Sequence, residues 1–237
     1  MWLAIDTSAD QAAVAVGDAG GPRAERSLRG ARQHAAQLLP MIDVVLAEAG
    51  ASLETLDGVL LADGPGSFTG LRVGAAVAKG LAAAHGLEVR TAPALLVLAA
   101  GALPPNRGPV LALTDALRGD VYAAVYDVQE TSVSVVRAPT VVTAGDAALL
   151  AARGAATVGT VHESILAAVA AQLAGPRLQA PMAPAAVLLQ LLDRRGALTP
   201  VVDIGRWEPA YGRPAEAQRK WEEAHGRPLP DPASDAG

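Results

Sequence analysis

Apolar positions along the first half of the chain change their spacing several times, and these changes predict strands alternating with helices. Short apolar runs bounded by turn residues indicate strands, whereas apolar residues three or four positions apart indicate helices. The predicted strands are 2–5, 11–17, about 22–28, 58–62 and 87–90, and the predicted helices are 33–48, 70–85 and 93–101. Three strands therefore precede the first helix, and single strands and helices alternate after it.

The second half repeats this opening in a fainter form. Its predicted strands are 109–115, 120–126, 132–137 and 155–159, and its predicted helices are about 144–153, 162–174 and 184–195. The segment 104–108, with two prolines and a glycine, is the natural junction between two lobes. We expect an N-terminal lobe at 1–106, a smaller C-terminal lobe at 107–225 and a disordered, proline-rich tail at 226–237.

This order of elements predicts the fold class. A three-stranded meander that leads into parallel crossovers is the ribonuclease-H-like arrangement of the actin, sugar-kinase and Hsp70 superfamily. We therefore predict an α/β protein of two ribonuclease-H-like lobes, with mixed sheets flanked by helices.

Composition narrows the function. The 237 residues are 51% apolar but only 3% aromatic, so the core must be built from Ala, Val and Leu. The formal net charge of −5 argues against a chain that holds nucleic acid alone. Cysteine is absent, which excludes disulfides and thiolate metal sites. The N-terminus has no basic segment and no stretch is apolar enough to span a membrane, so we expect a cytoplasmic protein without membrane contact.

The glycine-rich segment 63–74 is the clearest candidate for chemistry. An apolar strand ends in Gly-Pro-Gly and a helix begins at about Thr69, and such a helix N-terminus can hold an anion. The candidate phosphate-facing residues are Asp6, Thr7, Gly64, Gly66 and Ser67. The alternative is a tightly packed corner, with Asp6 and Ser8 bonding local amides. The spacing matches neither a Walker loop nor a dinucleotide-binding loop.

The helix after this loop carries small residues at regular intervals, at Gly70, Gly74, Ala78 and Gly80. Glycine inside a helix costs about 1 kcal/mol relative to alanine, so a compensating contact is expected. We expect close packing against another helix, either of this chain or of another subunit.

Catalytic constellations do not stand out. The four histidines are scattered, and no pair has the spacing of metal ligands. There is no G-x-S-x-G nucleophile elbow, and Ser67 lacks an evident Ser-His-Asp arrangement. We therefore predict no catalytic residues and no metal site.

Several motifs together resemble one family. They are the start L-A-I-D-T-S, Gln33-His34 ahead of L-L-P-M-I, the loop G-P-G-S-F-T-G-L-R-V-G, Asp115-Ala116, Arg118, and Asp120-Val121-Tyr122-Ala123. The chain is similar to the TsaB (YeaZ) family of bacterial tRNA threonylcarbamoyladenosine biosynthesis, specifically over about 1–126 and more weakly beyond. Trp207-Glu208-Pro209-Ala210-Tyr211 resembles the family's E-P-x-Y segment, but Gly212-Arg213-Pro214 replaces its usual Leu-Arg continuation.

The resemblance implies a non-catalytic role. The family is a degenerate relative of the catalytic subunit TsaD, which carries an H-x-x-x-H metal site after the equivalent helix. Here segment 90–97 has no histidine, and none occurs between His85 and His162. The implied function is a scaffold and dimerisation subunit, needed with TsaD and the ATPase TsaE to threonylcarbamoylate the adenosine beside the anticodon in tRNAs that read codons starting with A.

The resemblance also implies partners and a contact surface. We expect a heterodimer with TsaD, a homodimer when TsaD is absent, tRNA contact only through the complex, and ATP or ADP at the junction with TsaD rather than a cofactor of this chain alone. Pairing in this family uses helices of the N-terminal lobe. The expected contact residues are His34, Leu38, Leu39, Ile42, Arg72, Val73, Ala76 and Val77.

Two enzyme alternatives are weighed against this reading. An actin-like small-molecule kinase would use Asp6 and the 64–70 loop on ATP, with Asp115 as the most attractive base. The second lobe lacks the glycine-rich phosphate loop that such a kinase needs. A metallopeptidase would need the paired histidines that this chain lacks.

Overall fold

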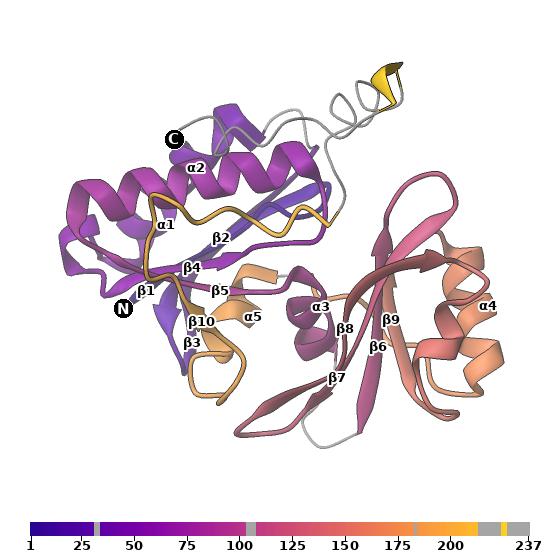
Figure 1. The fold of residues 1–237 in the computed structure, drawn as a ribbon. Coiled ribbons are helices and arrows are strands. Elements are labelled where there is room, and N and C mark those ends of the chain that lie inside the picture. The colour runs from indigo at the N-terminus through magenta and orange to yellow at the C-terminus, as the bar shows by residue number, and fades with distance from the viewer. Residues whose placement is uncertain (31–33, 103–107, 183, 213–223, 227–237) are drawn as a thin grey trace.

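The computed structural model describes residues 1–30, 34–102, 108–182, 184–212 and 224–226, and in these ranges the chain forms two β-sheets with helices around them (Figure 1). The first sheet has the strand order β10-β5-β4-β1-β2-β3. Its strands are β1 (Trp2–Asp6), β2 (Gln11–Asp18), β3 (Gly21–Arg29), β4 (Gly58–Ala62), β5 (Glu88–Ala92) and β10 (Thr199–Pro200). β1 is antiparallel to β2 and parallel to β4.

The second sheet repeats the opening of the first. Its order is β8-β7-β6-β9, and its strands are β6 (Pro109–Asp115), β7 (Asp120–Val128), β8 (Val133–Thr143) and β9 (Ala156–Thr160). β6 is antiparallel to β7 and parallel to β9, as β1 is to β2 and β4. The predicted pair of ribonuclease-H-like lobes with mixed sheets is therefore confirmed.

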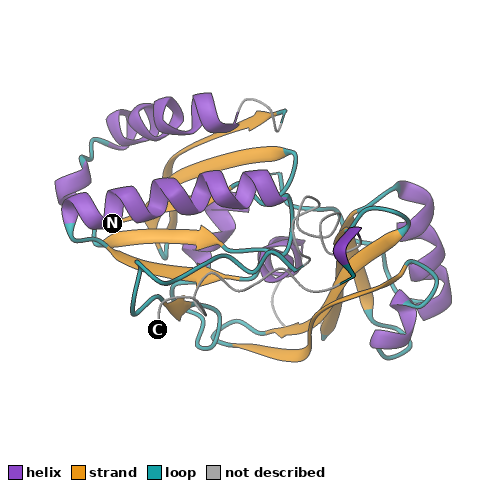
Figure 2. Ribbon diagram, turned by 45° about the horizontal axis from the view of Figure 1, so that its top comes forward, coloured by secondary structure: helices purple, strands orange, loops and turns teal. Residues whose placement is uncertain are grey.

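Helices cover both faces of each sheet (Figures 1 and 2). α1 (His34–Ala49) and α2 (Phe68–His85) lie side by side on one face of the first sheet, and α5 (Pro184–Gln190) lies on the other. α3 (Ala94–Ala102) packs on the inner face of the second sheet, and α4 (Glu163–Leu173) packs on its outer face. None of the helices in the described ranges has the length and apolar content needed to cross a bilayer.

One buried cluster joins the two lobes. It contains the inner faces of both sheets together with α3 and α5. From the first sheet, small side chains face this shared core: Ala4, Ala13, Ala15, Ala62 and Ala92. Larger side chains on the opposite face, such as Leu3 and Ile5, pack under α1 and α2. The alanine faces let the central helices approach the sheets closely, which explains how a core with few aromatic rings is filled.

The two central helices are exchanged between the lobes. α3 belongs to the first half of the chain but contacts β6, β7 and β9, whereas α5 belongs to the second half but contacts β1, β2 and β3. β10 then adds a strand to the edge of the first sheet. The range 107–225, which we predicted as one lobe, therefore contributes to both. The predicted boundary at 106 and 107 and the tail from 227 onward lie outside the described residues.

Two sequence expectations about local structure are wrong, and one short strand was missed. Segment 144–153 is not an α-helix, because β8 continues to Thr143 and only a 3₁₀ turn follows at Ala147–Leu150. α5 ends at Gln190 rather than near 195, and β10 carried no periodic signal because it has only two residues. In each case pairing or packing with distant residues decides the local structure.

The exchange of helices predicts that α5 stabilises the first lobe although it lies late in the chain. Leu188 on α5 is 0% exposed in the shared core. We expect Leu188→Ala to lower the free energy of unfolding by about 2–5 kcal/mol, because a cavity remains. Leu149, which is 80% exposed, is the matched control, and its alanine variant should change stability by less than about 0.5 kcal/mol. Urea unfolding measures both variants, and a similar loss for the two would contradict the arrangement.

Candidate functional site

The turn after β1 closes on itself and on the glycine-rich loop. Ser8 donates two hydrogen bonds to Oδ1 of Asp6, from its backbone N at 2.9 Å and from its hydroxyl at 2.6 Å. The Thr7 hydroxyl donates to the carbonyl oxygen of Gly70 at 2.7 Å. All three side chains of this turn are buried. The local turn expected from Asp6 and Ser8 is therefore present, and Thr7 ties it to α2.

The glycines of the loop and of α2 are required by this contact. A Cβ on Gly66 would lie 2.1 Å from the Ser8 carbonyl oxygen, and one on Gly70 would lie 2.0 Å from that of Thr7. A Cβ on Gly74 would lie 2.4 Å from the Thr7 hydroxyl. Real Cβ contacts are far longer, so a side chain at these positions would push α2 off the turn.

These contacts correct our expectation for the small residues of α2. Gly70 and Gly74 pack against the turn after β1 rather than against another helix. Gly80, by contrast, has nothing within 4 Å of where its Cβ would stand. The glycine spacing therefore has a structural cause within the lobe itself.

The loop is also covered by a C-terminal segment, residues 207–212. Gly64 has a φ of +109°, and a Cβ there would lie 2.3 Å from the carbonyl oxygen of Ala210. The Ala210 N–H donates to the Asp63 carbonyl at 2.8 Å, and the Ala94 N–H donates to the Gly64 carbonyl at 2.7 Å. The loop is thus held between this segment and the start of α3.

Side chains of segment 207–212 bridge α2 and the second lobe. The rings of Phe68 and Tyr211 lie 4.7 Å apart, and the Tyr122 hydroxyl of β7 donates to the Tyr211 carbonyl at 3.3 Å. Lys79 of α2 pairs with Glu208 at 2.9 Å, and this hydrogen bond lowers the pKa of Glu208. The E-P-x-Y motif, noted from the sequence only as a resemblance, therefore fastens both lobes across the glycine loop.

Two amides at the glycine-rich loop and the start of α2 donate hydrogen bonds inside the protein. The Ser67 N–H donates to the Ser8 carbonyl at 2.7 Å, and the Gly70 N–H donates to the Ser67 hydroxyl at 3.3 Å. These are two of the donors that could face an anion at the start of α2. The contacts thus support the packed-corner alternative, and a phosphate-facing role for Asp6, Thr7, Gly64, Gly66 and Ser67 stays a prediction.

Five of the eight expected partner-contact residues lie where a partner could reach them. Arg72 and Ala76 are exposed, Leu39 is 52% exposed, and Val73 and Val77 are half-buried. Leu38 and Ile42 are each only 1% exposed and pack into the core beneath α1, so assigning them to a partner surface was wrong. His34 begins α1, but its side chain lies outside what the structure describes.

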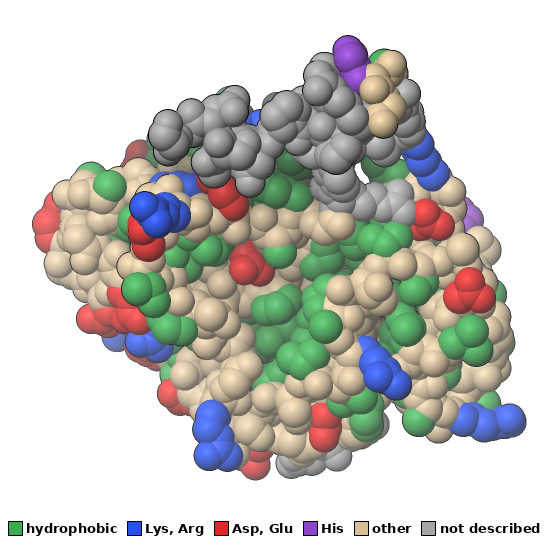
Figure 3. Space-filling view, in the orientation of Figure 1, with side chains coloured by type: hydrophobic (Ala, Val, Ile, Leu, Met, Phe, Trp, Pro, Cys, Tyr) green, Lys and Arg blue, Asp and Glu red, His purple; other side chains and the backbone are tan. Residues whose placement is uncertain are grey.

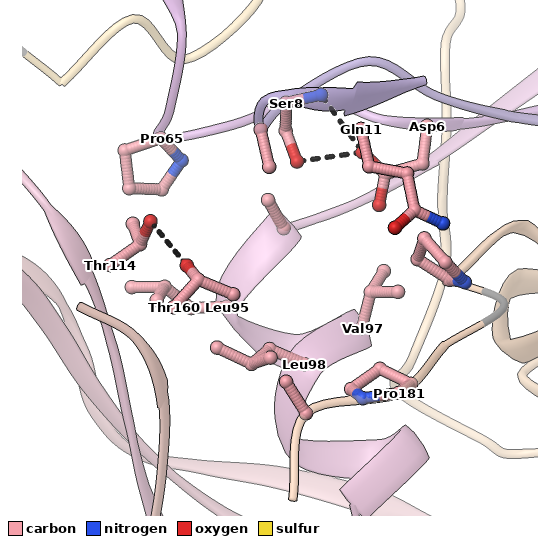
Figure 4. A pocket seen from close by; sticks show the side chains of 14 residues that line it. Asp6, Ser8, Gln11, Pro65, Leu95, Val97, Leu98, Thr114, Thr160 and Pro181 are labelled. Carbon is pink, nitrogen blue, oxygen red and sulfur yellow. Dashed lines mark hydrogen bonds between the residues drawn. The ribbon is translucent and has the colours of Figure 1, made fainter. Parts of the chain in front are cut away.

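A cleft between the lobes was not anticipated from the sequence. It has a cavity volume of about 90 Å³ and is lined by the turn after β1, by Pro65, by α3 and by the ends of β6 and β9. The hydroxyls of Thr114 and Thr160 lie 2.9 Å apart on one wall (Figure 4). The available signal was a threonine at or beside the end of each of two buried strands. Apolar side chains also gather on the face of the molecule where the lobes meet (Figure 3).

A half-buried acid, Asp63, lies beside the glycine loop, between the lobes. Burial raises the pKa of Asp63, and a hydrogen bond with Thr91 opposes this shift. Burial and the carboxylate of Asp63 both raise the pKa of Tyr126, whose hydroxyl has no hydrogen-bond partner among the described residues. Within those same residues, no group of three His, Cys, Asp or Glu side chains is placed to hold a metal ion.

Comparison with known proteins decides the family. The family model "TsaD: tRNA N6-adenosine threonylcarbamoyltransferase" matches residues 28–180, more than half of the chain. TsaB of Escherichia coli K12 is 37% identical over 132 residues, which cover 55% of this chain and 57% of that protein. The chain belongs to the TsaB (YeaZ) family, which is related to TsaD.

Other relatives agree over a similar span. TsaB of Haemophilus influenzae is 39% identical over 121 residues, which cover 51% of each chain. The chain thus spans about half the length of the curated relatives it matches.

Solved structures match over more of the chain. A protein described as having "similarity to peptidase YEAZ" from Pseudomonas aeruginosa has a TM-score of 0.70 and 27% identity, covering 90% of this chain and 99% of that one. YeaZ from Pseudomonas aeruginosa has a TM-score of 0.65 and 29% identity, covering 80% and 89%.

Two glycines of the same helix should respond oppositely to alanine. Gly74→Ala should lower the free energy of unfolding by about 1–3 kcal/mol, because its Cβ overlaps the Thr7 hydroxyl. Gly80→Ala should raise it by about 0.5–1 kcal/mol, because the site is open and alanine favours the helix. Chemical denaturation of both variants provides the measurement. Stabilisation by both would show that the contact with the turn after β1 is not tight.

The raised pKa of the half-buried Asp63 carboxyl group predicts a pH-dependent effect of Asp63→Asn. A raised folded-state pKa means that Asp63 favours folding only while it is protonated, and this contribution is lost as pH rises through the raised value. The neutral amide avoids that loss and can still accept the hydrogen bond from Thr91. We expect the variant's advantage in free energy of unfolding to grow from about pH 4 to pH 7. A difference that stays constant over this range would contradict the assignment.

Proposed function

We propose that this chain is a non-catalytic scaffold and dimerisation subunit of a tRNA threonylcarbamoyladenosine-forming complex. In this proposal it pairs with a TsaD-type catalytic subunit and acts together with a TsaE-type ATPase. The observation that carries the proposal is the similarity to proteins named as tRNA threonylcarbamoyladenosine biosynthesis protein TsaB, together with the TsaD family model.

The outer surface of α1 and α2 supports a role in pairing. Leu39 and Val44 of α1 are large apolar side chains that are 52% and 44% exposed. On α2, the exposed Ala76 and the half-buried Val73 and Val77 form a neighbouring ridge of small and medium apolar side chains. Two adjacent helices with such a surface can bury apolar area against a partner at about 25 cal/mol per Å². We expect the same surface to form a homodimer when the partner is absent.

The closed glycine corner supports a role without catalysis. A kinase acting through Asp6 and the 64–70 loop would need amide donors turned toward a phosphate. The Ser67 and Gly70 amides instead donate within the protein. In our proposal ATP or ADP therefore binds at the junction with the TsaD-type subunit.

Charge supports indirect contact with tRNA. The formal net charge of −5 gives this chain little attraction for phosphates, so tRNA is held through the rest of the complex.

Charged substitutions on the outer surface of the helices test the pairing surface. Leu39→Arg and Ala76→Arg place a cation on exposed positions, so the fold should survive. We expect each to weaken association with a co-expressed TsaD-type subunit by about tenfold or more, because an unpaired charge would be desolvated in the contact. Co-purification followed by light scattering measures the complex.

Ala171→Arg is the matched control, because Ala171 is exposed on α4 at the far face of the second lobe. It should leave association unchanged. Full association by both surface variants would refute the assigned surface. ATP turnover by the purified chain alone would refute the non-catalytic role in favour of the kinase alternative.

A further inference from the structure

The cleft between the lobes draws on both halves of the molecule and lies apart from the exposed helix surface of the proposed function. Asp6, Ser8 and Gln11 enter it from the first lobe, and Thr114 and Thr160 enter from the second (Figure 4). Its cavity volume is about 90 Å³, which suits only a small molecule. Most of its remaining wall is apolar and comes from α3 and from prolines.

Most hydrogen-bond donors on the polar side chains of the cleft already donate to other groups of the protein. The Ser8 hydroxyl donates to Asp6, and the Gln11 amide nitrogen donates to the carbonyl oxygen of Met182 at 2.9 Å. One of the two threonine hydroxyls must donate to the other. One N–H of Gln11 and one O–H of the threonine pair are therefore left as donors.

The side chains of Ser8, Gln11, Thr114 and Thr160 keep more hydrogen-bond acceptor positions than donors. The hydroxyl oxygens of Ser8 and of both threonines keep lone pairs, and so does the Gln11 amide oxygen. Asp6 is the charged side chain among the described residues that line the cleft, and it is an acid. A phosphate brings negative charge and only acceptors when fully ionised, so it fits this wall poorly. The matching ligand brings N–H donors and a compact apolar body.

We propose that the cleft binds a small primary amine, with its ammonium group among Ser8, Gln11 and the threonine pair and its apolar body against α3. An ammonium group carries three N–H donors and accepts none, which complements the surplus of acceptors. The leucines and valine that α3 turns toward the cleft, Leu95, Val97 and Leu98, supply the apolar floor (Figure 4). This inference goes beyond the scaffold role and does not depend on it.

A matched set of probes tests the ligand class on the full-length protein. The probes are 2-phenylethylamine, 2-phenylethanol, 3-phenylpropionate and Mg-ADP, titrated by calorimetry at pH 7, where the amine is protonated. We expect saturable one-to-one binding of the amine, about tenfold tighter than the alcohol, which corresponds to 1.4 kcal/mol. The carboxylate and Mg-ADP should bind most weakly.

Two variants locate the binding in the cleft. Thr114→Val with Thr160→Val removes both hydroxyls and keeps the shape, so the fold should persist and the amine should bind at least about threefold more weakly. Ala9→Leu places three more carbons at a half-buried position of the cleft wall and should reduce binding of amine and alcohol alike. Ala171→Leu on α4 is the control and should bind the amine as the wild type does.

Three results would overturn the proposal. The first is Mg-ADP or the carboxylate binding more tightly than the amine, which would make the cleft an anion site. The second is equal affinity for the amine, the alcohol and the carboxylate, which would make it an unselective apolar groove. The third is no saturable binding of the amine, or amine binding that Ala9→Leu leaves unchanged.

Discussion

The contact between the turn after β1 and the first turns of α2 is the constraint on which the first lobe depends. Gly66, Gly70 and Gly74 allow the backbone of the turn to approach to distances that no side chain would permit. The Thr7 hydroxyl and the Ser67 amide then join the two segments by hydrogen bonds. Because β1 and β4 are neighbours in the sheet, this contact fixes where α2 leaves the sheet and which of its faces remains outside. It also uses one amide, that of Ser67, that could otherwise face an anion.

The two lobes are held together because each half of the chain contributes a helix that packs on the sheet of the other half. α3 and α5 each pack on the sheet of the other half of the chain, and both lie in one buried cluster. Segment 207–212 adds a second connection, since it bonds to Asp63 of the first lobe and is bonded by Tyr122 of the second. The shared core and this segment together fix how the two lobes lie against each other.

The two functional surfaces, the outer face of α1 and α2 and the cleft, depend on different parts of the fold. The closed glycine corner fixes which face of α2 points away from the sheet. That face carries the ridge of Val73, Ala76 and Val77 beside α1. The cleft follows from the meeting of the lobes, because its walls come from the ends of strands in both sheets. Substitutions on one surface therefore leave the other intact, and partner binding and ligand binding can be measured separately.

The sequence by itself determined most of the strands and helices, the two-lobed fold class, the family and the absence of cysteine chemistry, because these depend on composition, local periodicity and motifs. Of the contact residues predicted from it, Leu39, Arg72 and Ala76 are accessible, whereas Leu38 and Ile42 are buried. Helical spacing alone does not say which face of a helix a sheet will cover. Only the tertiary structure decided that Gly70 and Gly74 serve a turn more than sixty residues earlier, that α3 and α5 change lobes, and that Thr114 and Thr160 meet in a cleft. Each of these depends on contacts between residues far apart in the chain, for which local spacing carries no signal.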